Sequence, residues 1–373
     1  DKAVRHYTRA FDGVEPASIQ VADEIIENAG ALLDIELKSA IDQAADNIRR
    51  FHALQLNEEE RLETMPGVTC WRKRVPIEKV GLYIPGGTAP LFSSVLMLAI
   101  PAALAGCKEI VLCTPPGKGD EVHPAILYAA SVAGVHKVYR IGGVQAIAAM
   151  VYGTSTVTSV YKIFGPGNQY VTAAKQYAHQ IGVAIDMPAG PSEVLVIADE
   201  QSDPDFVAID LLSQAEHGAD SQIVLLTSDE SFVMRVQASI ERLLDGLPRK
   251  EIALKALAHS FAVVLERKDL MEFSNTYAPE HLIIQTGDAE VLSEKVINAG
   301  SVFIGPWTPE SAGDYASGTN HTLPTNYAAR AYSGVSCDTF LRTVTFQQIN
   351  ETGLRNVGPI VEKMAAAEQL EAH

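Results

Sequence analysis

The chain has 373 residues, enough for two or three domains, and its 47% hydrophobic and 20% charged residues are ordinary for a globular protein. Asp and Glu number 46 against 29 for Lys and Arg, which gives a formal net charge of -17. This excess argues against nucleic acid or a membrane as a main partner, because both anionic surfaces are bound through Lys and Arg, and no apolar run reaches the length of a membrane span.

Residues 1–75 are predicted to be helical. Apolar residues recur at three- and four-residue spacing across 17–33 and 36–56, which is the period of an amphipathic helix. This part of the chain contains no evident chemistry, so packing or a dimer contact is its expected role.

From residue 80 the pattern changes to short apolar strands that alternate with loops and helices. Strands are expected at 80–84, 109–113, 137–141 and 161–164. Such alternation predicts a parallel sheet with helices on its faces, and a ligand where loops leave the carboxyl ends of the strands.

Three of these loops contain glycine-rich turns, at 85–87, 142–143 and 165–167. Glycine allows backbone N–H groups to approach a phosphate at a helix N-terminus. None of the turns has the pattern Gly-x-Gly-x-x-Gly, so each is also compatible with a tight turn alone. A nucleotide site formed by the three together remains an open hypothesis.

The second half repeats the α/β pattern, with strands expected at 194–197, 222–227, 261–265, 282–285 and 301–304. Asp203 followed by Pro204 predicts the start of a helix that runs to about Gly218. Gln214 and His217 are three residues apart and share a face of this helix, which is metal-ligand spacing. A histidine at a helix end also fits an interaction with the terminal carbonyls and the helix dipole.

Two later segments complete the chain. Residues 307–321 are crowded with small and polar side chains and are predicted to form a long functional loop, because such a segment cannot bury a core by itself. Pro359 is expected to start a last helix, from residue 360 to the end.

Glu280 and His281 stand side by side after Pro279, between two apolar runs. Pro279 disfavours helix at Ala278, so a stiffened turn or the start of an element is expected here. A carboxylate beside an imidazole suits general acid/base chemistry. The alternative is that both residues only cap the element that begins at Leu282, and the pair alone does not decide between the two.

The four cysteines are interpreted as reduced, mostly buried thiols, which indicates a cytoplasmic protein. Cys70, Cys107, Cys113 and Cys337 include no Cys-x-x-Cys spacing, so neither a disulfide framework nor a cysteine zinc site is predicted.

Six long motifs make the chain similar to the histidinol dehydrogenase family, whose members catalyse the last steps of histidine biosynthesis. The resemblance covers nearly the whole chain. The motifs are Gly-Leu-Tyr-Ile-Pro-Gly-Gly (81–87), Lys-Ile-Phe-Gly-Pro-Gly-Asn (162–168), Asp-Met-Pro-Ala-Gly-Pro-Ser-Glu-Val (186–194), Leu-Leu-Ser-Gln-Ala-Glu-His-Gly (211–218), Tyr-Ala-Pro-Glu-His-Leu (277–282) and Gly-Asp-Tyr-Ala-Ser-Gly-Thr-Asn-His (313–321).

The resemblance implies an α/β fold of two incomplete Rossmann-like parallel-sheet domains with helical N- and C-terminal extensions, in an intertwined homodimer. Residues 1–80 and 192–335 are expected to form one domain, which carries the metal and catalytic residues. Residues 81–191 are expected to bind NAD, and residues 336–373 to reach the partner subunit.

The resemblance also assigns site residues. The zinc ligands would be Gln214, His217, Asp314 and His373, the last supplied to the site of the other subunit. The NAD contacts would be Tyr83, Gln145 and Asn168. The substrate contacts would be Ser192, His321 and Glu368, together with the four zinc ligands and His281.

The implied reaction oxidises L-histidinol to L-histidine through L-histidinal, with two NAD molecules used in succession and one zinc ion per subunit that positions the substrate. His281 would take the alcohol proton, and again a proton when the hydrate is oxidised, while Glu280 would help a water attack the aldehyde.

Two alternative functions are less consistent with the residues present. A paralogue could oxidise another small primary alcohol, such as a sulfonated diol, with the same zinc and NAD, but it would be expected to lose His321, Glu368 and His373, which are present. A non-catalytic zinc and nucleotide-binding module is disfavoured by the intact pair Glu280 and His281.

Overall fold

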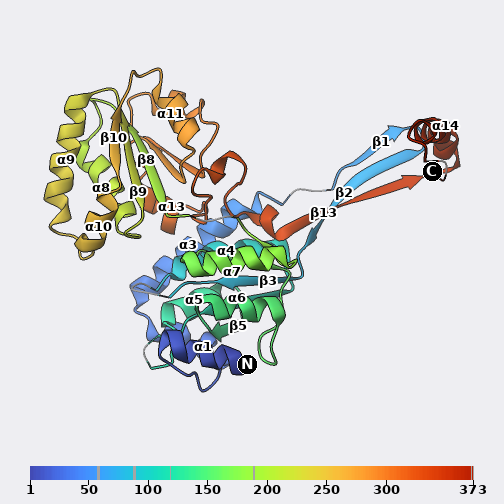
Figure 1. The fold of residues 1–373 in the computed structure, drawn as a ribbon, viewed down its shortest axis with the longest axis horizontal. Coiled ribbons are helices and arrows are strands. Elements are labelled where there is room, and N and C mark those ends of the chain that lie inside the picture. The colour runs from blue at the N-terminus through green and yellow to red at the C-terminus, as the bar shows by residue number, and fades with distance from the viewer. Residues whose placement is uncertain (57–58, 87–89, 118, 188–189, 371, 373) are drawn as a thin grey trace.

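The computed structural model describes residues 1–373 except 57–58, 87–89, 118, 188–189, 371 and 373. Two α/β units lie side by side, and a thin arm carries the C-terminal end of the chain away from both of them (Figure 1). The predicted α/β class with two parallel sheets is confirmed.

The first sheet contains five parallel strands in the order β5-β4-β3-β6-β7. Its strands are β3 (Lys79–Tyr83), β4 (Glu109–Thr114), β5 (Lys137–Arg140), β6 (Lys162–Phe164) and β7 (Ala184–Ile185). The helices that follow them are α4 (Phe92–Ala105), α5 (Pro124–Val132), α6 (Gly143–Tyr152) and α7 (Gln169–Gln180). The first strand lies in the centre and the chain winds outward to both edges, which is the doubly wound arrangement.

The second sheet has the same winding, in the order β10-β9-β8-β11-β12. Its strands are β8 (Glu193–Ala198), β9 (Gln222–Thr227), β10 (Phe261–Val264), β11 (His281–Ile284) and β12 (Ser301–Ile304). Its helices are α8 (Pro204–Ala215), α9 (Glu230–Leu244), α10 (Lys250–Leu257), α11 (Leu270–Tyr277), α12 (Ala289–Ser293) and α13 (Glu310–Tyr315). All nine strands predicted in the two sheets are confirmed, each end within one residue.

Two local predictions in this unit have different outcomes. The Asp203 side chain accepts a hydrogen bond of 2.8 Å from the Asp205 amide, so the predicted cap of α8 is confirmed. The segment 307–321 is not a continuous loop, because α13 occupies its middle.

The N-terminal helices pack on the unit of the first sheet. They are α1 (Lys2–Asp12), α2 (Asp23–Asn28), the 3-10 turn η1 (Ala29–Leu32) and α3 (Ile35–Ala53). Ile26 and Ile41 belong to the same buried core as Leu82 of β3 and Leu96 of α4. The expected grouping of residues 1–80 with 192–335 differs from this packing, because α2 and α3 bury their apolar sides against α4 and α5.

The arm is a three-stranded antiparallel sheet in the order β1-β2-β13. It consists of β1 (Arg61–Met65), β2 (Val68–Pro76) and β13 (Leu341–Ile349), and the prediction of helix up to residue 75 is therefore wrong. Strand β2 pairs along its whole length with β13, and Trp71 stacks on Phe346 with ring centroids 5.3 Å apart. The strand conformation is thus stabilised by a partner that lies far away in the sequence, which a local pattern does not reveal.

Helix α14 (Glu351–Ala367) follows the arm and lies at its tip, distant from both sheets (Figure 1). Asn350 is the N-cap of α14, and its side chain accepts a hydrogen bond of 2.8 Å from the Gly353 amide. The helix therefore begins before Pro359, which lies inside it, and the predicted start at this proline is wrong.

Within the described residues, none of the helices has both the length and the apolar character needed to cross a membrane. The four cysteines are free thiols, with Cys113 and Cys337 buried.

Candidate functional site

Glu280 and His281 are held by a sharp change of direction between α11 and β11. Helix α11 ends at Tyr277, and Ala278 adopts a left-handed conformation with φ 56° and ψ 62°. This is the turn that Pro279 predicts, because proline excludes the helical conformation at the residue before it. The turn directs both side chains inward, and only 6% of Glu280 and 4% of His281 are exposed.

The pair lies at the amino end of the second sheet. His281 is the first residue of β11 and stands opposite Val194 of β8 and Ser301 of β12. At the opposite, carboxyl end of the sheet, polar groups bond to each other. The Gln285 side-chain amide donates to the Asp210 carboxylate at 2.8 Å, and the Gln285 carbonyl oxygen accepts from the Ser202 hydroxyl at 2.9 Å. The pair is therefore an exception to the rule that ligands bind at the carboxyl ends of parallel strands.

Three carboxylates and one backbone carbonyl surround the His281 ring. Its Nδ1 donates to the Glu193 carbonyl oxygen at 3.2 Å and lies 3.7 Å from oxygens of both Glu280 and Glu310. Its Nε2 lies 3.4 Å from Asp314 Oδ1. Burial lowers the pKa of His281, but the charges of Glu310, Glu280 and Asp314 outweigh burial and raise it to about 10.

Glu280 is poised to exchange a proton near neutrality. One of its carboxylate oxygens accepts a hydrogen bond of 2.8 Å from the Glu193 amide. Burial raises the pKa of Glu280 to about 7, although the His281 charge and this hydrogen bond oppose the shift. A carboxyl group with such a pKa can act both as acid and as base under physiological conditions.

Glu310 is a site residue that the sequence did not single out. It is 0% exposed, and neither carboxylate oxygen has a hydrogen-bond partner among the described residues. Burial raises its pKa to about 8. Its only signal in the sequence was its place in the polar segment 307–321.

Gln214, His217 and Asp314 converge in one cavity of about 410 Å³ beside Glu280 and His281. Gln214 lies on α8, is 0% exposed, and has no partner within the described chain for either atom of its amide. His217 Nε2 lies 3.9 Å from Asp314 Oδ2. An orphaned amide oxygen, an imidazole nitrogen and a carboxylate fit a zinc ion, although an amide is an unusual zinc ligand.

A second donor set overlaps with the first. One ligand atom each of His281, Glu310 and Asp314 lie within 4.8 Å of one another. However, Glu310 is not among the described residues that line the cavity, whereas Gln214, His217 and Asp314 all are.

The cavity lies between the two α/β units. Ser192, His281 and His321 line it from the second unit, while Ser94 of α4 lines it from the first. His321 Nδ1 lies 2.8 Å from the Asp314 carbonyl oxygen, and its Nε2 lies 3.1 Å from Ser94 Oγ. Ser94 was not predicted, since a serine in an apolar helix gives no sign of the residue it faces.

The glycine turn at residue 165 is fixed by a buried ion pair. Lys175 Nζ contacts Asp186 Oδ1 at 2.5 Å and the Gly165 carbonyl oxygen at 2.8 Å. Gly165 has φ 118°, and a Cβ there would overlap the Tyr83 carbonyl oxygen, so only glycine fits. The turn is therefore positioned for a close approach to β3.

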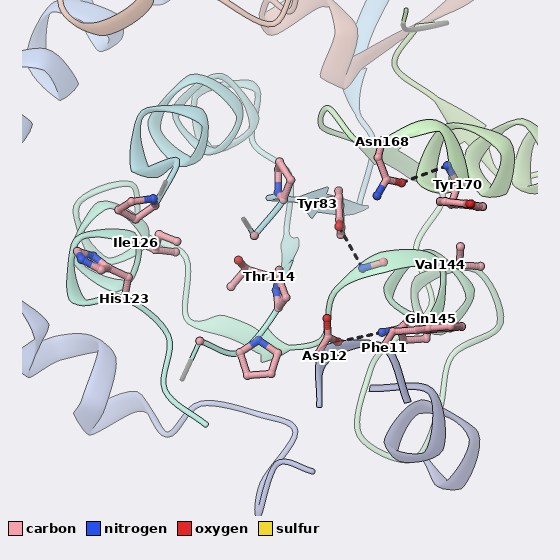
Figure 2. Close-up of a pocket in the computed structure, with 17 residues that line it drawn as sticks. Phe11, Asp12, Tyr83, Thr114, His123, Ile126, Val144, Gln145, Asn168 and Tyr170 are labelled. Atoms are coloured by element: carbon pink, nitrogen blue, oxygen red, sulfur yellow. Dashed lines mark hydrogen bonds between the residues drawn. The ribbon is translucent and has the colours of Figure 1, made fainter. Parts of the chain in front are cut away.

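A larger cavity of about 880 Å³ lies over the carboxyl ends of the first sheet (Figure 2). Tyr83 at the end of β3, Gln145 on α6 and Asn168 at the cap of α7 all line it, and these are the residues that the resemblance assigns to NAD. Tyr83 Oη accepts a hydrogen bond of 3.0 Å from the Gly143 amide, and Asn168 caps α7. The volume suits a ligand of cofactor size.

The two cavities adjoin, because Pro85 and Asn168 line both of them. A dinucleotide in the larger cavity could therefore present one end to the substrate cavity.

Glu368 is a predicted site residue that does not line the cavity of its own chain. Glu368 is exposed at the end of α14, on the tip of the arm, and His373 lies outside the described residues.

Comparisons with known proteins agree with each other. The family model described as histidinol dehydrogenase matches residues 1–373. A histidinol dehydrogenase from Bacteroides thetaiotaomicron is 60% identical, over 100% of this chain and 87% of its own length. The crystal structure of a histidinol dehydrogenase from Elizabethkingia anophelis has a TM-score of 0.98 and 56% identity, and the match covers 100% of this chain and 86% of that one. An acetylating aldehyde dehydrogenase from Geobacillus thermoglucosidasius shares the fold alone, with 13% identity and a TM-score of 0.52 over 92% of this chain and 94% of that one.

Proposed function

The chain belongs to the histidinol dehydrogenase family, a family of oxidoreductases, and we propose that it oxidises L-histidinol to L-histidine through L-histidinal with two molecules of NAD and one zinc ion per subunit. The observation that carries the proposal is the buried pair Glu280 and His281, which shares a cavity with Gln214, His217 and Asp314.

The zinc would be held by Gln214, His217 and Asp314, with His373 supplied by the partner subunit. We prefer this set to the one with Glu310 because its three described members all line the cavity. When bound, zinc would hold the amine and imidazole of the substrate and offset the Asp314 charge, which lets the pKa of His281 fall into the range of a base.

In the first oxidation His281 would accept the alcohol proton, and NAD, when bound, would supply the acceptor for the carbinol hydride. The hydrogen bond from Nδ1 to the Glu193 carbonyl fixes the tautomer, so Nε2 is the basic atom and faces the cavity side of the ring. Ser192 and His321, which line the same cavity, would hold the substrate, together with Glu368 of the other subunit.

In the second oxidation Glu280 takes a proton from the water that adds to the aldehyde carbon. His281 would then accept a hydroxyl proton of the resulting hydrate, and a second NAD would supply the hydride acceptor, which leaves the carboxylic acid. For each L-histidinol, two hydrides pass to two NAD molecules, one water is consumed and two protons are released with the carboxylic acid, so atoms and electrons balance.

We further propose that the protein is a homodimer with shared sites. Leu354 and Met364 of α14 are each 61% exposed, and Val361 between them is 45% exposed, so this helix has an apolar side that no described part of its own chain covers. Glu368 is the C-cap of α14, a helix that lies away from both sheets (Figure 1), and it does not line the cavity of its own chain. An arm of this kind could reach the cavity of the partner subunit. The part of the chain that contributes to the partner's cavity would be residues 336–373.

The remaining proposals concern the units and their location. Residues 81–191 would bind NAD through Tyr83, Gln145 and Asn168. Residues 192–335 would carry the catalytic centre, and the free thiols fit a cytoplasmic enzyme.

The test is NADH production from L-histidinol by the purified protein. Two NADH for each substrate consumed, with L-histidine as product, is the expected result. One NADH for each substrate, or oxidation of a sulfonated diol in preference to L-histidinol, would overturn the proposal.

A further inference from the structure

Asp12 brings a carboxylate into the larger cavity from outside the sheet (Figure 2). It is the last residue of α1, and its Oδ2 accepts a hydrogen bond of 3.2 Å from Gln145 Nε2. No described group donates to its other oxygen. One acceptor is therefore held in place by Gln145 and the other is free for a ligand.

Asp12 is the only carboxylate among the described residues that line this cavity, and they include neither Lys nor Arg. In doubly wound folds that bind NAD, an acidic residue commonly accepts hydrogen bonds from the ribose of the adenosine half. Here the central strand's neighbour β4 ends at Thr114 and is followed by Pro115 and Pro116, so no acid stands at that end. Among the described residues that line the larger cavity, Asp12 is therefore the carboxylate that can take this role.

The position of Asp12 identifies the half of the dinucleotide that it faces. The wall shared with the substrate cavity is formed by Pro85 and Asn168, so the reacting end of the cofactor belongs there. Asp12 does not line the substrate cavity. Phe11 beside it is 71% exposed and offers an aromatic face to a base, as expected at the adenosine end.

The surroundings of Asp12 favour a neutral hydrogen-bond donor over an anion as its ligand. Burial raises the pKa of its carboxyl group, and the Gln145 amide opposes the shift. A partly desolvated carboxylate gains from a hydroxyl donor and is repelled by a second anion.

We propose that Asp12 selects NAD over NADP: its free oxygen accepts a hydrogen bond from the hydroxyls of the adenosine ribose, and its charge repels a 2′-phosphate. The inference rests on the proposed use of NAD and names the residue that makes the cofactor choice. A hydrogen bond to a charged group corresponds to roughly a tenfold change in affinity or more.

The test is Asp12→Asn in the full-length zinc-loaded protein, because asparagine keeps an acceptor for Gln145, removes the charge and replaces the free acceptor oxygen by an amide NH2 group. We expect the Kd for NAD, measured by calorimetry, to rise about tenfold and the Kd for NADP to fall. We expect kcat at saturating NAD to stay within about twofold of the unsubstituted protein, because Asp12 does not touch the reacting atoms.

Two further variants complete the design. Glu15→Gln removes the same charge from an exposed residue that pairs with Arg9, and it should leave both affinities unchanged. Asp12→Ser, which is smaller and uncharged, should shift the ratio of the two affinities in the same direction as Asp12→Asn.

The outcomes separate this inference from the function on which it rests. If the unsubstituted protein oxidises L-histidinol with NAD but both Asp12 variants keep its NAD-to-NADP ratio, Asp12 does not make the choice and only this inference is overturned. If the unsubstituted protein uses neither dinucleotide, the proposed function is overturned and this inference with it.

Discussion

Replacing Glu310 by glutamine should slow turnover about a hundredfold while NAD binding remains unchanged. The substitution removes a charge 3.7 Å from His281 Nδ1 and preserves the shape of a side chain that is 0% exposed. His281 becomes positively charged while it holds the proton of the alcohol, so the Glu310 charge stabilises that state more than the ground state.

The magnitude follows from the distance. Two unit charges separated by 3.7 Å attract by roughly 4.5 kcal/mol at an effective dielectric constant of about 20. Glu310 is charged for only part of the time, because burial raises its pKa to about 8, and the other carboxylates remain in the variant. About 2–3 kcal/mol is therefore expected to be lost, which corresponds to roughly 30- to 150-fold in kcat.

The assay is NADH formation at saturating L-histidinol and NAD, with zinc content and thermal unfolding measured on the same samples. Glu290→Gln, at an exposed position of α12, is the matched control and should behave like the unsubstituted protein. If Glu310→Gln folds, binds zinc and turns over within about threefold of the unsubstituted rate, the carboxylate does not stabilise the charged imidazole. Should the glutamine variant fail to fold, Glu310→Asp keeps the charge and must retain more activity than Glu310→Ala.

Three further predictions test other parts of the proposal. His281→Asn should lower kcat by at least about a hundredfold with an unchanged Kd for NAD, because proton transfer is lost, and a variant with the full rate would show that His281 is not the base. Prolonged chelation should abolish NADH production and added zinc should restore it, whereas activity indifferent to the chelator would refute the metal site. Deletion of residues 351–373 should abolish metal binding and activity, and coexpression with a full-length His281→Asn chain should restore part of both in mixed dimers. A fully active truncated monomer would contradict the shared site.

The strands of the two sheets could be predicted because their signal is local. Strands such as β8 and β9 are short, mostly apolar runs whose residues are buried, and each run has turn residues at its ends. The turn at Ala278 was equally local, since Pro279 restricts the residue before it. In both cases the residues that determine the structure are neighbours in the sequence.

The arm and half of the catalytic surroundings could not be predicted, because their partners are distant in the chain. Strand β2 depends on β13, and its charged residues Arg72 to Arg74 conceal the alternation of a strand. The Glu193 carbonyl that orients His281 is a backbone group, which leaves no trace in a sequence. Glu310 acquires its role only in the fold, where α13 brings its carboxylate to 3.7 Å from His281 Nδ1.

Pro85 and Asn168 line both cavities, and this arrangement bears on how the protein could retain an aldehyde intermediate between two oxidations. A double oxidation requires one spent dinucleotide to depart and a fresh one to arrive while a reactive aldehyde waits. Because the two cavities adjoin but have mostly different linings, a dinucleotide could be exchanged through the larger cavity while the aldehyde is held by the residues of the smaller one. The partition would thus protect the amines of other molecules from an aldehyde that never diffuses away.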